Sequence, residues 1–231
     1  MHRTIVISDI HGEIGKFEKL LEKTEYRPDA DQLILLGDYV DRGPDSKRTV
    51  EKVMELKKKG AIVLKGNHDD MMEKSFREGK FLKVWLLNGG LQTLESYGYE
   101  LPRTDDGMES MLADLNPLKE TDTIRAHIDF FESLDHLYET DDYIFVHAGV
   151  HPVDPLESTD PAVFLWIRDE FHEGYAGEKT VIFGHTPTHS LHEGCDVHFG
   201  TNNIIGIDGG CVFGGRLNAL ELPSRKVYHV E

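Results

Sequence analysis

The segment QLILLGDYVDRG, residues 32–43, changes from apolar to strongly charged within a few positions. Its Leu and Ile residues form a short apolar run of the kind found in buried strands. Asp38, Asp41 and Arg42 follow immediately, between two glycines. A solvated turn with an ion pair would explain this segment taken alone. Its meaning therefore depends on how the other apolar runs end.

Composition restricts the class of protein. The chain has 231 residues, of which 39% are hydrophobic and 29% charged, and this indicates a globular protein that can bury a core. No apolar run approaches the length of a membrane helix or signal peptide, and we expect no membrane partner. Cys195 and Cys211 provide no disulfide framework, so a cytoplasmic location is expected.

The net charge of −17 argues against a non-specific nucleic-acid binder, which needs a cationic surface to displace counterions. It does not argue against a small anionic ligand, because such a ligand responds to the local field. The oligomeric state is left open.

The apolar runs predict a regular alternation of strands and helices. Ile14, Phe17 and Leu20 share one face of a helix, and Pro44 and Asp45 are well placed to begin a second. Strand, helix, strand, helix, strand implies parallel pairing with right-handed crossovers. The predicted strands are 4–8, 32–36, 61–65, 143–147, 180–184 and 204–208.

The rest of the chain continues one α/β domain, 1–231. Residues from about 70 to 140 are predicted to be mainly helical, including MESMLADL and IRAHIDFFESL. The tail from about 178 to 231 is rich in strands and glycine turns.

Nearly every predicted strand ends in residues that bind metals. In an open α/β sheet, ligands bind beyond the carboxyl ends of the strands, so these side chains are expected to lie together. A single histidine or an Asn-His pair would more often be structural, but independent turns have no reason to share ligand chemistry. The joint pattern predicts a metal site. The residues concerned are Asp9, His11, Asp38, Asn67, His147 and His185, with His68 beside Asn67.

Three spaced motifs resemble the phosphoprotein phosphatase branch of the calcineurin-like metallophosphoesterases, in particular bacterial serine/threonine protein phosphatases. They are DIHG (9–12), GDYVDRG (37–43) and GNHD (66–69), followed by the two later histidines; the tail IDGGCVFGGRLNAL resembles bacterial members. The resemblance implies a four-layer α/β/β/α sandwich of mixed sheets with parallel β-α-β units at the N-terminus. The residues from about 70 to 140 would be a helical insertion in this domain.

The resemblance also implies two divalent ions, with Mn²⁺ favoured and Fe or Zn as alternatives. Mixed nitrogen and oxygen ligands suit these metals, and a hydroxide held between them would be the nucleophile. Asp38 would be shared by both ions. The remaining ligands would be Asp9 and His11 on one ion, and Asn67, His147 and His185 on the other.

The charged turn contributes catalytic groups by the same resemblance. Asp41 would hold one imidazole nitrogen of His68, and His68 would donate a proton to the leaving alkoxide. Arg42 and Arg168 would grip the phosphoryl oxygens. For Arg168, a surface ion pair within its Arg-Asp-Glu run is the alternative.

These inferences favour a phosphomonoesterase, specifically a serine/threonine protein phosphatase acting on phosphorylated proteins or small phosphoesters. The alternative is a symmetrical dinucleoside-tetraphosphate hydrolase, which would use the same metal centre on a phosphoanhydride. Phosphotyrosine activity stays open, and a non-catalytic metal-binding interaction module is a distant third. Asp69 stands where eukaryotic relatives have Glu, so their regulatory partners are not carried over.

Three further segments admit two interpretations. The loop 185–198 contains four histidines and Cys195, which would fit a second zinc site, but it is more consistent with a polar loop. The segment NGGLQTLESYG (88–98) would form either a substrate rim or helix caps and turns. Asp208 would either orient a metal-bound histidine or begin the turn at Gly209.

Overall fold

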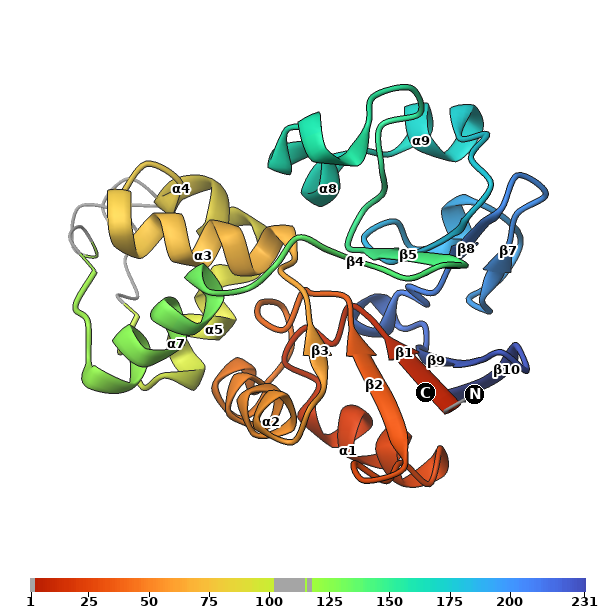
Figure 1. Cartoon of the computed structure of the whole chain (residues 1–231). Coiled ribbons are helices and arrows are strands. Elements are labelled where there is room, and N and C mark those ends of the chain that lie inside the picture. The colour runs from red at the N-terminus through yellow and green to blue at the C-terminus, as the bar shows by residue number, and fades with distance from the viewer. Residues whose placement is uncertain (1–2, 102–114, 116–117) are drawn as a thin grey trace.

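The computed structural model describes residues 3–101, 115 and 118–231. Two five-stranded mixed sheets face each other, and helices cover their outer faces, as in the predicted α/β/β/α sandwich (Figure 1). The first sheet has the order β10-β9-β1-β2-β3. Its strands are β1 (Arg3–Ile7), β2 (Asp31–Leu35), β3 (Ile62–Val63), β9 (Leu217–Leu222) and β10 (Lys226–Val230).

The first sheet begins as the sequence predicts. Strands β1, β2 and β3 pair in parallel through α1 (Ile14–Lys23) and α2 (Ser46–Lys58). Asp45 caps α2 by accepting a hydrogen bond from the Arg48 backbone. The third strand is shorter than predicted, because α3 begins at Asn67; Leu64 still donates its backbone N–H to Leu35 of β2, and Lys65 donates to Asp135. The tail then adds β9 antiparallel to β1 and β10 beyond it.

The second sheet has the order β4-β5-β6-β8-β7, and its central strands β5, β6 and β8 are parallel. Helices α8 (Pro161–Trp166) and α9 (Asp169–Gly174) lie over its outer face (Figure 1). The strands are β4 (Leu137–Glu139), β5 (Tyr143–Val146), β6 (Thr180–Phe183), β7 (His198–Phe199) and β8 (Ile204–Gly206).

Alternation along the strands explains the two-sheet packing. Ile5 and Ile7 of β1 belong to the core beneath α1 and α2, whereas Val6 between them packs into the layer shared by both sheets. Phe145 and Ile182 reach the same layer from the second sheet. A third core joins the second sheet to α8 and α9. Three apolar cores thus separate the four layers of secondary structure: one lies between the two sheets, and one lies between each sheet and its helices.

A cluster of helices stands to one side of the sheets (Figure 1). It comprises α3 (Asn67–Glu78), α4 (Leu82–Trp85), a π-helical turn (Leu86–Gly90), α5 (Leu91–Ser96) and α7 (Asp122–Glu132). This agrees with the helical character predicted for the middle of the chain. The predicted helix MESMLADL lies outside the described residues except for Leu115. No helix in the described part of the chain is long and apolar enough to span a membrane.

One buried pair in this cluster predicts acid sensitivity. The Tyr97 hydroxyl lies 2.6 Å from His127 Nδ1, and burial lowers the pKa of His127 from 6.5 to about 4. Between these values the unfolded chain binds a proton that the folded chain does not, so stability falls as the pH drops from 6.5 to 4. This contribution stays below about 3.5 kcal/mol, since one pKa unit corresponds to about 1.4 kcal/mol.

We therefore expect His127→Gln to reduce the loss of unfolding free energy between pH 7 and pH 4.5, measured by urea denaturation. His172, whose pKa burial also lowers to about 4, would retain part of the slope. His189→Gln, at an exposed position, is the control and should leave the slope unchanged. Identical slopes for wild type and His127→Gln would contradict the assignment.

Candidate metal and catalytic site

The predicted ligands meet between the two sheets. Asp9 and His11 follow β1, Asp38 follows β2, and Asn67 and His68 open α3 after β3. The second sheet contributes His147 after β5 and His185 after β6. The rule for a single open sheet predicts that these groups lie together, and they do, but the strands that carry them belong to two sheets. The sandwich brings the ends of two sheets together.

The backbone around the site is tightly constrained. Asp9, His11, Asp38 and His185 all have left-handed backbone conformations, with φ between 46° and 61°. Such values are uncommon outside glycine and persist where the surrounding structure imposes them. A Cβ on Gly66 would lie 2.2 Å from the backbone nitrogen of Asp38, so only glycine allows these loops to approach so closely.

Hydrogen bonds fix which nitrogen of each histidine faces the centre. His11 Nδ1 donates to the Val40 carbonyl at 2.7 Å, and His147 Nδ1 donates to the Leu36 carbonyl at 2.9 Å. Burial lowers the pKa of both rings and favours their neutral form. Each therefore directs the lone pair of Nε2 toward the centre.

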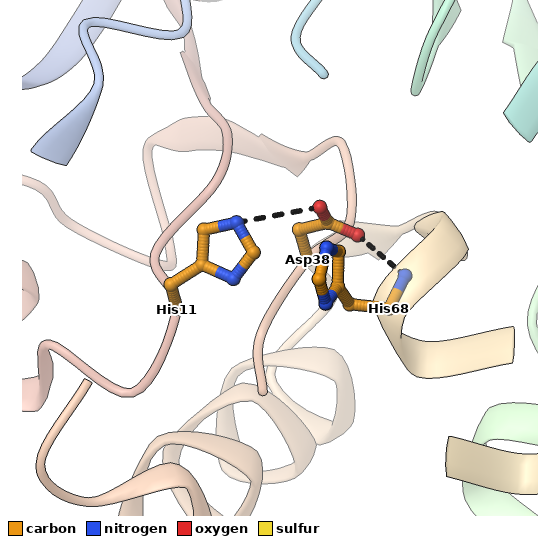
Figure 2. Close-up of side chains that lie close together, drawn as sticks. All are labelled: His11, Asp38 and His68. Carbon is orange, nitrogen blue, oxygen red and sulfur yellow. Dashed lines mark hydrogen bonds and ion pairs between the residues drawn. The ribbon is translucent and has the colours of Figure 1, made fainter. Parts of the chain in front are cut away.

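These lone pairs point at a carboxylate. His11 Nε2 lies 3.4 Å from Asp38 Oδ2, and His147 Nε2 lies 3.4 Å from Asp38 Oδ1. Figure 2 shows Asp38 between His11 and the first residues of α3, where the His68 backbone N–H donates to Asp38 Oδ1 at 3.0 Å. Burial and the neighbouring carboxylate of Asp9 raise the pKa of Asp38. Converging acceptors of this kind provide a favourable place for a cation.

The donor set fits divalent metal ions. Two groups have ligand atoms within 4.8 Å of one another: Asp9, Asp38 and His147, and His11, Asp38 and His68. Asp38 belongs to both groups, as a shared ligand would. Nitrogen and carboxylate donors without thiolates suit Mn, Fe or Zn.

Asn67 and His185 stand beside these groups. The Asn67 side-chain oxygen lies 2.8 Å from His147 Nε2 and 2.9 Å from His185 Nδ1, and buried His185 Nε2 has no hydrogen-bond partner among the described residues. The two groups pair Asp9 with His147 and His11 with His68, which differs from the division expected from sequence. The assignment of each ligand to one ion stays a prediction.

His68 and Asp41 form the expected pair. His68 Nδ1 lies 2.6 Å from Asp41 Oδ2, and both side chains are buried. Trp85 Nε1 donates to both carboxylate oxygens of Asp41, and the Thr93 hydroxyl donates to Oδ1 at 2.7 Å. Burial raises the pKa of Asp41 to about 7, and these two donors pull it in the opposite direction. Burial also lowers the pKa of His68.

The two arginines come from different segments, Arg42 from the turn after β2 and Arg168 from the junction between α8 and α9. Arg42 Nη1 lies 2.7 Å from His11 Nε2, so its guanidinium reaches a predicted metal ligand directly. Arg168 donates to the Thr186 hydroxyl at 2.9 Å, beside His185. The neighbouring carboxylates Asp169 and Glu170 lie near histidines instead, so the structure does not form the alternative ion pair within the Arg-Asp-Glu run.

Three contributors to the site were missed in the sequence. Asp69 accepts hydrogen bonds from the backbone N–H groups of Asp38, Tyr39 and Gly66, and so holds the turn that carries Asp38. Trp85 and Thr93 hold Asp41. The position of Asp69 beside GNH is a usable signal in the sequence, and Thr93 lies in the segment 88–98, for which a substrate rim is one interpretation. The sequence around Trp85 gives no indication that its side chain contacts Asp41.

Two further candidates from the sequence make local structural contacts. Asp208 Oδ1 accepts from the Gly210 backbone at 2.8 Å, which is the turn interpretation. In the loop 185–198, His185 belongs to the central site, and among the described residues this loop contains no group of three metal-binding side chains.

The Thr93 contact leads to a testable expectation. Thr93→Val removes the hydroxyl that donates to Asp41 Oδ1 and accepts from the Asp41 backbone at 2.9 Å. A hydrogen bond to a charged group contributes about 1.5–3 kcal/mol. We therefore expect kcat to fall about tenfold or more on a phosphoserine peptide, whose leaving group needs a proton. Metal content, measured by mass spectrometry, should not change. Thr93→Ser keeps the hydroxyl and should keep kcat; an equal loss in both variants would contradict this role.

Comparisons with known proteins agree with this geometry. The sequence model of the calcineurin-like phosphoesterases matches residues 2–215. The chain belongs to the calcineurin-like phosphoesterase family. This phosphoesterase is a metal-dependent hydrolase of phosphoric esters, as the motifs implied.

Two relatives of this phosphoesterase carry the name bis(5'-nucleosyl)-tetraphosphatase PrpE (asymmetrical). The protein from Halalkalibacterium halodurans is 27% identical, with 94% of this chain and 89% of the relative aligned. The protein from Bacillus thuringiensis is 29% identical, with 97% of this chain and 92% of the relative aligned.

Solved structures resemble the phosphoesterase over its whole length. A candidate diadenosine tetraphosphatase has a TM-score of 0.70 and 25% identity, with 99% of this chain and 93% of that chain covered. A Saccharomyces cerevisiae protein serine/threonine phosphatase similar to human PP5 has a TM-score of 0.65 and 14% identity, with 100% and 80% covered. At 14% identity, the similarity to the Saccharomyces cerevisiae phosphatase shows a shared fold alone.

Proposed function

We propose that this phosphoesterase is a bis(5'-nucleosyl)-tetraphosphatase that cleaves its substrate asymmetrically. The observation that carries the proposal is the alignment, over nearly the full length of both chains, with relatives of that name. This reverses the order of preference reached from sequence, where the protein phosphatase came first and the tetraphosphatase was considered as a symmetrical enzyme.

The candidate site supports this proposal, because its residues would provide what phosphoanhydride hydrolysis requires. Divalent ions, when bound, acidify a water molecule and neutralise charge on the phosphoryl group. Asp38, with the carboxylate of Asp9 and the lone pairs of the surrounding histidines, would hold them. We assign the phosphoryl oxygens to the guanidinium groups of Arg42 and Arg168, which can each donate two parallel hydrogen bonds. The leaving group is a nucleotide phosphate, which departs without needing a proton.

A second candidate is phosphomonoester hydrolysis on serine or threonine phosphoproteins. The observation that favours it is the His68–Asp41 pair, whose nitrogen and oxygen lie 2.6 Å apart. Asp41 fixes His68 with Nδ1 as the donor, so Nε2 is available to carry a proton to a leaving alkoxide. A serine alkoxide is a poor leaving group, and this arrangement suits it.

The test compares kcat/KM of Mn²⁺-loaded protein on diadenosine tetraphosphate, a phosphoserine peptide and a phosphotyrosine peptide. We expect a preference of at least a hundredfold for the dinucleotide, with ATP and AMP as products by chromatography, and loss of turnover with chelator. Preference for a phosphopeptide would overturn the proposal in favour of the second candidate. ADP alone would indicate symmetrical cleavage. Two bound metals per chain without turnover on any substrate would indicate a non-catalytic module.

A further inference from the structure

An open pocket adjoins the metal centre on the side of Arg42. It has a volume of about 380 Å³, within the range of small-molecule sites, and its lining includes Arg42, Leu87, Asn88, Gln92 and Phe213. Arg42 connects the two sites, because it lines this pocket while its guanidinium reaches His11. A phosphate held by Arg42 would therefore carry whatever it is attached to into the pocket.

The walls of the pocket are apolar and exposed. Phe213 is 60% exposed and Leu87 is 62% exposed, although large apolar side chains are usually covered. The Arg42 guanidinium carbon lies 5.1 Å from the centre of the Phe213 ring and covers one of its faces. The exposure of the ring leaves room for a flat group to stack on it.

Backbone contacts fix the positions of Phe213 and of the turn that carries Leu87. Phe213 ends a 3₁₀ turn (Cys211–Phe213) flanked by Gly210 and Gly214 in left-handed conformations, and Lys16 Nζ donates to the Cys211 carbonyl. On the opposite side, the Arg42 backbone N–H donates to the Gly89 carbonyl at 3.1 Å. A Cβ on Gly89 would lie 2.6 Å from Arg42 Cγ, so the turn that carries Leu87 is packed directly against Arg42.

The polar groups of the pocket are amides. Asn88 uses its side-chain N–H to cap the Val84 carbonyl at 2.8 Å, which leaves its side-chain oxygen as an acceptor. Gln92 contributes a second amide and has no side-chain hydrogen bond among the described residues. The lining contains one cation and, within the described part of the chain, no carboxylate. Side-chain amides match the donor and acceptor edge of a purine.

We propose that this pocket binds a nucleobase, with the base stacked on Phe213 beside Leu87 and its edge hydrogen-bonded by Asn88 or Gln92. The proposal deepens the proposed function, on which it rests, by placing one nucleoside of the substrate next to the reacting phosphate. An open pocket lined by one aromatic ring and two amides suits a base better than an extended phosphopeptide. Stacking on an aromatic ring tolerates any base, so the site would select nucleotides without selecting one base strongly.

The test measures equilibrium binding by calorimetry to the Mn²⁺-loaded protein, with AMP and ribose 5-phosphate as ligands. The two share the sugar and phosphate and differ by the base. We expect wild type to bind AMP about tenfold more tightly, the magnitude of one base–aromatic stack. Phe213→Leu should reduce this ratio toward one, whereas Phe213→Tyr should retain it. Phe199→Leu, which removes an exposed ring on β7, should retain it as well.

Several results would overturn the proposal. Equal affinities of wild type for the two ligands would mean that the base is not recognised. A ratio unaffected by Phe213→Leu would place the base elsewhere. Retention by Phe213→Tyr excludes a general loss of folding as the cause of a positive result. The outcome is separable from the proposed function, because discrimination for AMP can persist in a protein that does not hydrolyse diadenosine tetraphosphate.

Discussion

Replacement of Asp38 by Asn is expected to reduce kcat on every substrate by a factor on the order of 10³ or more. The variant should also retain at most one metal ion per chain, measured by mass spectrometry after desalting. Loss of groups that only orient a metal ligand already costs about 10–100-fold, and Asp38 lies in both groups of candidate ligands. A neutral amide in its place cannot offset the charge of two cations.

Asp45→Asn is the matched control for this prediction. It removes the same charge seven positions along the chain, and Asn caps a helix about as well as Asp, so α2 should be unaffected. If Asp38→Asn bound two metals with wild-type turnover, the assignment of a shared carboxylate would have to be abandoned.

Replacement of His68 by Asn should have an effect that depends on the leaving group. A general acid contributes about 10²–10⁴-fold where a proton must be transferred. We therefore expect a loss of about 10²-fold or more in kcat on a phosphoserine peptide, and about tenfold or less on p-nitrophenyl phosphate or diadenosine tetraphosphate, whose leaving groups need no proton.

Metal content decides between two roles for His68, because its ring also lies near Asp38 and His11. A general acid can be removed without loss of metal, whereas a ligand cannot. Loss of one metal together with equal losses on all substrates would make His68 a ligand. His189→Asn, an exposed histidine on the short turn after β6, should be neutral in both measurements.

Much of the candidate site could be predicted because its residues lie within a few sequence positions of strand ends. Asp9 and His11, Asp38, Asn67, His147 and His185 each follow an apolar run within a few positions, and a periodic pattern locates such ends. The division of the strands between two sheets could not be read from the runs themselves, since each is compatible with burial on both faces. The resemblance to a family provided that information.

Contacts between distant segments were inaccessible for a different reason. Trp85 reaches Asp41 across 44 positions and Thr93 across 52, and nothing in either neighbourhood encodes the partner. The bridge between Leu64 and Asp135 likewise joins residues that are far apart in the sequence. Tertiary packing decides such features, and local propensity cannot.

The buried hydrogen bonds to Asp41 have a consequence for how this protein can diversify. The loops after the strands and the start of α3 provide the candidate metal ligands, whereas α4 and α5 contact Asp41 through Trp85 and Thr93. On the proposed roles, ion binding and proton delivery would be separable, because Trp85 and Thr93 contact Asp41 and belong to neither group of candidate ligands. Exchanging α4 and α5 between members of the family, with α3 left unchanged, should alter which leaving groups are tolerated while the ions remain bound.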